Sequence, residues 1–136
     1  MRLARLLAPL LGAALMAAAA PALAHHSFAM FDMTRTVTLD GVVKDFQWTN
    51  PHVILWIETT PAHGAPEVWS AELTSPGNLT RGGWTKRSLK PGDKVAVELH
   101  PLRDGGKGGG FEKAVIKDTG HVLSADLRTA VDPSAR

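Results

Sequence analysis

The chain has 136 residues, with 15 Lys or Arg against 13 Asp or Glu, and it contains no cysteine. This length suits one domain of ordinary size. The lack of cysteine excludes disulfides, cysteine zinc sites and iron–sulfur clusters, so hydrophobic burial must hold the fold together.

The first 24 residues have the pattern of a secretory signal peptide. Residues 1–5 carry two arginines and no acid, residues 6–20 are mostly apolar, and Ala22 and Ala24 offer small side chains to a signal peptidase. The apolar run is shorter than the roughly 20 residues of a membrane span, and two histidines follow it instead of a basic flank. We expect cleavage after Ala24, with cleavage after Ala22 as the competitor, and export to the periplasm without membrane insertion.

The signal peptide also accounts for the positive charge. Removing Arg2 and Arg5 with it leaves 112 residues that carry 13 basic and 13 acidic side chains, a net charge of zero with neutral histidines. Nucleic acids and anionic lipids are bound through clustered lysines and arginines. A nucleic-acid partner is therefore not expected.

The rest of the chain reads as short strands separated by turn signals. Residues 36–48 predict one long strand that is bent or bulged at Gly41. Four further strands are predicted at 52–59, 67–73, 94–100 and 111–117, and the glycine-rich residues 105–110 are interpreted as the connection between the last two.

A short helix is expected between the third and fourth strands. Ser75 can cap it, and Pro76 suits its first position. Three strands, a helical turn and two strands predict an all-β fold, a small five-stranded barrel of the oligonucleotide/oligosaccharide-binding (OB) type. A β-sandwich is the alternative.

These elements divide the chain into four parts. They are a signal peptide (1–24), an N-terminal segment (25–35), a β-barrel domain (36–122) and a C-terminal tail (123–136).

The second predicted strand is apolar on both faces. Val53, Leu55 and Ile57 alternate with Ile54 and Trp56, and only one of these sets can point into a barrel. The other face needs a cover, which can be a partner, a ligand or residues 28–31 of the same chain. We expect residues 28–31 to supply it.

Cleavage after Ala24 would make His25 the first residue of the mature protein. Its free amine and imidazole can then chelate one metal ion, and an imidazole from His26 or His52 would complete a T-shaped set of three nitrogens. Nitrogen donors of this kind suit copper, nickel or zinc, so copper is the candidate cofactor and no other is expected. The alternative interpretation is that the two histidines are a solvated polar start.

The other histidines have simpler interpretations. His52 follows Asn50-Pro51, where it can form a hydrogen bond within the turn, and His100 ends the fourth predicted strand. The second and fourth strands both run antiparallel to the first, so these two histidines are expected near opposite ends of the barrel and not on one ion. His63 and His121 lie in loops and are expected to be solvated.

A second candidate site is metal-free. Trp48, Trp56 and Trp84 can form a surface for a periplasmic protein or a small apolar ligand. Enzymatic activity is not expected, because the chain has no Gly-x-Ser-x-Gly elbow, no phosphate-binding Gly-Lys-Ser/Thr loop and no His-Glu-x-x-His motif.

Several motifs carry a family resemblance. They are the stretches at 25–32 (HHSFAMFD), 46–52 (FQWTNPH), 75–84, 89–93 (LKPGD) and 100–105 (HPLRDG). Together they resemble a family of small exported proteobacterial proteins that is classed as a domain of unknown function. The resemblance implies a periplasmic β-barrel module and includes His25, His26, Trp48, His52 and Trp84 among its motif positions.

Overall fold

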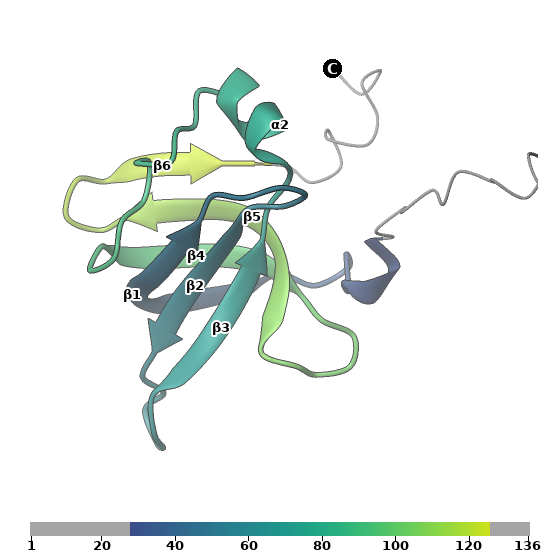
Figure 1. Cartoon of the computed structure of the whole chain (residues 1–136). Helices are drawn as coiled ribbons and strands as arrows, with labels where there is room; N and C mark the ends of the chain where they lie inside the picture. Colours follow the sequence, from purple (N-terminus) through teal and green to yellow (C-terminus); the bar gives the residue numbers. More distant parts are fainter. Residues whose placement is uncertain (1–27, 126–136) are drawn as a thin grey trace, which may run out of the picture.

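The computed structural model describes residues 28–125, so His25 and His26 lie outside the described range (Figure 1). The elements in chain order are η1 (Phe28–Met30), β1 (Val37–Gln47), β2 (Ile54–Thr59), β3 (Glu67–Glu72), α2 (Pro76–Arg81), β4 (Lys94–Pro101), β5 (Gly108–Ile116) and β6 (His121–Ser124). Within residues 28–125, no helix has the length and apolar character needed to cross a bilayer.

The strands form one sheet that closes into a barrel. Their order is β3-β2-β1-β4-β5-β6, and the neighbours in this order are antiparallel. A parallel pairing of β3 with β5 then joins the two sides, so β1 to β5 enclose a five-stranded barrel (Figure 1). This confirms the all-β barrel with a short helix between the third and fourth strands.

The glycine-rich stretch forms part of this closure. Gly108, Gly109 and Gly110 pair with Ser70, Ala71 and Glu72 in turn. β5 therefore starts three residues earlier than predicted. A Cβ atom on Gly109 would lie only 2.3 Å from the carbonyl oxygen of His100, so this glycine permits the close approach of β4 and β5.

A second glycine allows a close approach in β1. Gly41 pairs with both β2 and β4, and a Cβ atom at this position would lie 2.4 Å from the carbonyl oxygen of Glu58. The bulge that was predicted here lies further along, where the register with β2 shifts between Val43 and Asp45. Gly41 thus serves the packing of three strands, while the bulge is at Lys44.

β6 is a strand that the sequence pattern did not predict. It pairs with the last residues of β5, from Lys113 to Ile116, and it continues past residue 122 to Ser124. Its one buried side chain is Leu123, which joins the core.

The core is formed by the inward side chains of the barrel strands. Val53, Leu55 and Ile57 are fully buried, as the alternation in the second strand predicts. α2 adds Leu79, and the residues after it add Trp84 and Leu89. Ser75 caps this helix, since its Oγ accepts a hydrogen bond from the backbone N–H of Asn78 at 3.3 Å.

Candidate functional site

His52 lies just before β2 on the outer face of the barrel and is half-buried. Its Nδ1 contacts the carboxylate of Glu72 at the end of β3. The register explains the contact, because Ile54 pairs with Glu72 and His52 is two residues earlier on the same face. The contact fixes the orientation of the imidazole ring across two strands.

Sequence reasoning missed Glu72. Its neighbours Ala71 and Leu73 are buried, so alternation directs the carboxylate to the outer face. The alternation of the sequence predicts this outward direction. It does not predict the register of β2 and β3, which places the carboxylate beside His52.

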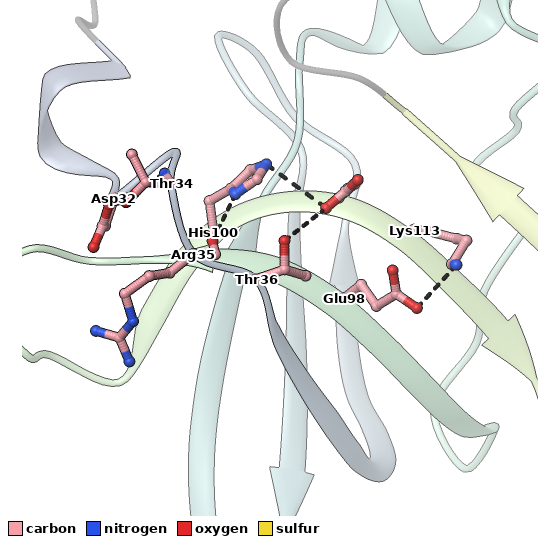
Figure 2. Close-up of polar contacts among 8 residues, drawn as sticks. Asp32, Thr34, Arg35, Thr36, Glu98, His100 and Lys113 are labelled. Atoms are coloured by element: carbon pink, nitrogen blue, oxygen red, sulfur yellow. Dashed lines mark hydrogen bonds and ion pairs between the residues drawn. The ribbon is translucent and has the colours of Figure 1, made fainter.

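His100 joins the N-terminal segment to β5, as Figure 2 shows. Its Nδ1 lies 2.8 Å from the carbonyl oxygen of Arg35, and because a carbonyl only accepts, Nδ1 carries the proton. Its Nε2 lies 3.6 Å from Oε2 of Glu112, which also accepts a hydrogen bond from the hydroxyl of Thr36 at 3.4 Å. The His100 side chain is only 12% exposed. Both ring nitrogens therefore face acceptor groups of the protein.

The expectation that His52 and His100 lie near opposite ends is wrong. Glu72, the partner of His52, pairs with Gly110, and Gly110 pairs with His100 on its other side. The cause is the stagger of the strands in a closed barrel. Along β1, the end of β4 pairs at Val37 and the start of β2 pairs at Gln47, ten residues apart. On the other side of the barrel, the pairing of β3 with β5 brings the end of β4 and the start of β2 to a similar level.

The two histidines still do not share an ion. Two strands, β3 and β5, lie between them, so their backbones are about 14 Å apart at a strand spacing of about 4.8 Å. Among residues 28–125, no group of three or more His, Cys, Asp or Glu side chains could hold a metal ion. The described residues alone therefore do not make a metal site.

The remaining histidines are remote from His52. His63 lies in the exposed loop after the far end of β2, and His121 pairs with Ile116, six residues along β5 from Gly110. Six residues of strand span about 20 Å. Neither histidine is placed to complete a site with His52.

Residues 29–32 are anchored where β4 ends. Phe31 is buried and forms a β-bridge with Leu102. The backbone N–H of Arg103 donates to the carbonyl of Met30 at 2.9 Å, and the Arg103 Nε donates to the carbonyl of Ala29 at 3.0 Å. The N-terminal segment thus reaches the barrel at a defined point.

This anchoring corrects a second expectation. Residues 28–31 were expected to cover the outer face of the second strand, but Met30 and Phe31 contact Leu102 and Arg103 instead. Trp56 on the outer face of β2 remains 37% exposed. The aromatic ring of Phe31 finds its burial beside the extension of β4, where backbone hydrogen bonds also hold the segment.

Two carboxylates near the anchored segment and the barrel closure have shifted pKa values. The hydroxyl and the backbone N–H of Thr34 donate to Asp32 and lower the pKa of its carboxyl group. Lys107, in the loop before β5, lowers the pKa of Glu67 at the start of β3 through an ion pair. Both groups are therefore ionised at neutral pH.

The three tryptophans of the predicted surface have different positions. Trp84 is only 3% exposed and belongs to the core, where its Nε1 donates to the carbonyl of Ser124 at 3.1 Å. The prediction that Trp84 lies on an accessible surface is therefore wrong, because its ring packs into the core three residues after the end of α2. Trp48 is partly buried against the core, with its ring 5.6 Å from that of Phe46. Trp56, which is 37% exposed, is the most accessible of the three.

Sequence comparison places the chain in a family. Residues 13–112 match a family described as "Family of unknown function (DUF6152)". The chain belongs to this family. The DUF6152 region includes His25, His52, Glu72, His100 and Glu112, and it ends within β5. No curated protein and no solved structure matches the chain.

Proposed function

We propose that this DUF6152 protein is a periplasmic binding protein that holds a copper-type ion through the amine and imidazole of His25 together with His52. The observation that carries the proposal is the His52–Glu72 pair, which lies near the level of the barrel at which the N-terminal segment is anchored, since Glu72 pairs with Gly110 and Leu102 lies beside Gly108. His26 is the other candidate for the third nitrogen.

The length of the N-terminal segment supports this arrangement. Phe31 is next to Leu102, and successive backbone pairings lead from there through Gly108 on β5 to β3. Three strand intervals amount to about 14 Å and lead to Ser70, and Glu72 is two residues further along β3, which puts it about 16 Å from Phe31. Six residues separate His25 from Phe31, and a chain of that length spans at most about 20 Å. The length of this segment is therefore comparable with the distance to Glu72.

Glu72 suits the second coordination shell of such an ion. Histidine ligands of metals usually direct their other ring nitrogen to a carboxylate or carbonyl, which orients the ring and raises its basicity. Nδ1 of His52 faces Glu72, which is the carboxylate contact typical of a metal-bound histidine. His100 lies about 14 Å away, across β3 and β5.

The test is a copper titration of protein that begins at His25, with nitrogen ligands counted from the EPR spectrum of Cu(II). The wild type is expected to show three nitrogens. His52→Ala should leave two and lower the affinity about 100-fold, and Glu72→Gln, which keeps an acceptor for Nδ1, should lower it about tenfold, since outer-shell partners are worth 10–100-fold. His121→Ala is the matched control and should change nothing. Equal affinity and nitrogen count in wild type and His52→Ala would refute the role of His52.

Localisation has its own measurement. Mass spectrometry of protein recovered from the periplasm would give the N-terminal residue and any bound metal together. A mass that starts at His25 supports the proposal, whereas a chain that retains residues 1–24 contradicts it.

A metal-free interaction surface is the second candidate, and a specific observation favours it. On the outer faces of β1, β2 and β3, Val42 is 40% exposed, Trp56 37% and Val68 42%. Val42 and Val68 both pair with Glu58, two residues from Trp56 on the same face, so the three apolar side chains lie close together. A protein or small apolar ligand could cover them.

Fluorescence quenching tests the accessibility that this surface requires. Trp56→Phe is expected to lower the acrylamide-quenchable tryptophan emission, because Trp56 is 37% exposed, whereas Trp84 is 3% exposed. Trp48 and Trp69 are partly buried and contribute a remaining quenchable fraction. Trp84→Phe is the comparison and should leave the quenchable emission in place. If Trp56→Phe leaves the quenching unchanged, Trp56 is not accessible in solution, and this result contradicts the proposed interaction surface.

A further inference from the structure

The stretch 81–94, which runs from the end of α2 to the start of β4, carries an excess of positive charge (Figure 1). Its one acid is Asp93. Its five cations, which we call the basic patch, are Arg81, Lys86, Arg87, Lys90 and Lys94. Residues 28–125 hold eleven basic and eleven acidic side chains in all, so with neutral histidines this stretch is at +4 and the other described residues are at −4.

The cations of the basic patch are not neutralised within the described part of the chain. All five are exposed, and none forms an ion pair with a carboxylate of residues 28–125. Arg81 contacts only the neutral amide of Asn78. Elsewhere on the barrel, Lys107 pairs with Glu67 at 2.5 Å and Lys113 with Glu98 at 2.9 Å. The positive charge of the basic patch is therefore available to a partner.

The backbone that carries the basic patch is ordered by two tight turns, at 85–88 and 90–93. Each is closed by a hydrogen bond from the backbone N–H of its last residue to the carbonyl of its first, at 3.0 and 3.1 Å. Trp84 and Leu89, the residues before the two turns, are buried in the core. The second turn is also tied to Val43 of β1, whose carbonyl accepts from the N–H of Gly92 at 2.9 Å. The stretch thus follows the outside of the barrel along a fixed path.

The two turns bring the cations together. The first and last residues of a tight turn lie within about 7 Å of each other. Lys86 and Arg87 are the central residues of the first turn, and Lys90 and Lys94 lie on either side of the second. Four of the five cations therefore lie close to one another on one part of the surface.

We infer that the basic patch is a peripheral docking surface for a lipid bilayer with anionic headgroups. A bilayer of this kind attracts lysines and arginines through its surface potential and needs no shaped pocket. Most protein interfaces are instead centred on an apolar or aromatic anchor, and single-stranded nucleic acids are bound through exposed aromatic rings. The exposed residues of 81–94 include no aromatic side chain, and Pro91 is their one apolar side chain. This inference goes beyond the proposed metal binding and does not depend on it.

The charge of the other described residues does not oppose this docking. Salt screens charges over about 8 Å at physiological ionic strength. A bilayer that contacts the basic patch therefore responds to the +4 of this stretch, while most of the acids on other parts of the barrel are screened. The separation of charge also orients the protein, because the rest of the barrel is repelled by an anionic surface.

The experiment measures the binding of protein that begins at His25 to two kinds of vesicle, one of phosphatidylcholine alone and one that is one-third phosphatidylglycerol. A metal chelator is present throughout, so the result is independent of copper. Each lysine or arginine near an anionic surface contributes about fivefold to binding. The wild type is expected to bind only the anionic vesicles, and Lys86→Gln combined with Arg87→Gln should weaken this binding about 25-fold.

The matched control is Lys107→Gln combined with Lys113→Gln. It lowers the net charge by the same two units, but both lysines lie outside the basic patch and form ion pairs with Glu67 and Glu98 (Figure 2). Binding to the anionic vesicles is expected to stay within twofold of the wild type. All four substituted residues are exposed or at the surface, and circular dichroism checks that both double variants fold. If the patch variant does not fold, Lys90→Gln alone should still weaken binding about fivefold.

Three results would overturn the inference. The first is a wild type that does not distinguish anionic from neutral vesicles. The second is an equal loss of binding in the two double variants, which would show that net charge and not the basic patch sets the binding. The third is a wild type that a short oligonucleotide retains but anionic vesicles do not, which would assign the basic patch to nucleic acid. Selective loss in the patch variant supports the membrane surface.

Discussion

Protein with an acetyl group on the His25 amine is expected to bind Cu(II) about 100-fold more weakly than protein that begins at His25 with a free amine. Acetylation converts the His25 amine into an amide, so the ring formed by amine, metal and imidazole is lost. A factor of 100 corresponds to about 2.7 kcal/mol of binding free energy. Competition with a chelator of known affinity measures both proteins on one scale.

The control for this experiment is His52→Ala combined with the acetylated amine. If the amine and His52 bind one ion, their losses of binding free energy are not additive, because His52 contributes little affinity once the chelate is lost. Additive losses would indicate two separate sites. Equal, weak binding by the acetylated and the unacetylated protein would rule out the N-terminal chelate.

Trp84→Ala is expected to lower the free energy of unfolding by about 3–5 kcal/mol, the usual cost of removing a buried tryptophan. Trp84 packs edge to face on Phe111, with ring centroids 5.6 Å apart, and its centroid is 6.2 Å from that of Phe46. Its indole N–H also holds the carbonyl of Ser124 at the end of β6. Domains have only about 5–15 kcal/mol of stability in total, so urea denaturation should show a large shift of the midpoint.

Two further variants identify the cause of that loss. Trp84→Phe keeps an aromatic ring but removes the N–H donor, and it should cost less than Trp84→Ala. Trp56→Ala removes a tryptophan of the same size from the outer face and should change stability little, as surface substitutions usually do. If Trp56→Ala and Trp84→Ala destabilise equally, the different burial of the two rings is not what sets their contributions.

Local sequence signals were sufficient to predict most of the barrel. Alternation identified the buried face of β2, and Ser75-Pro76 identified the start of α2. β6 was not predicted, because it is only four residues long and has one buried side chain, Leu123. The glycines at the start of β5 were interpreted as a connection because glycine usually weakens a strand. They pair with β3 because the barrel needs a close approach there.

The candidate site depended more on register than on local pattern. His52 was identified from the chain, but its partner Glu72 is 20 residues away, and His100 contacts Glu112 and Arg35 from two further elements. No local signal reports the stagger with which the barrel closes. The sequence therefore identified the candidate histidines, but it did not show that His52 and His100 lie at a similar height along the barrel axis.

The short pairing of β3 with β5 also bears on aggregation. A sheet with open edges offers unpaired backbone groups to other chains, and proteins usually protect such edges with charge, bulges or short strands. Here residues 70–72 and 108–110 join the two sides, and the strand added beyond the barrel, β6, is four residues long. These three pairs of residues thus shorten the strand edge that is open to neighbouring molecules, in a chain that has no disulfide to keep it folded.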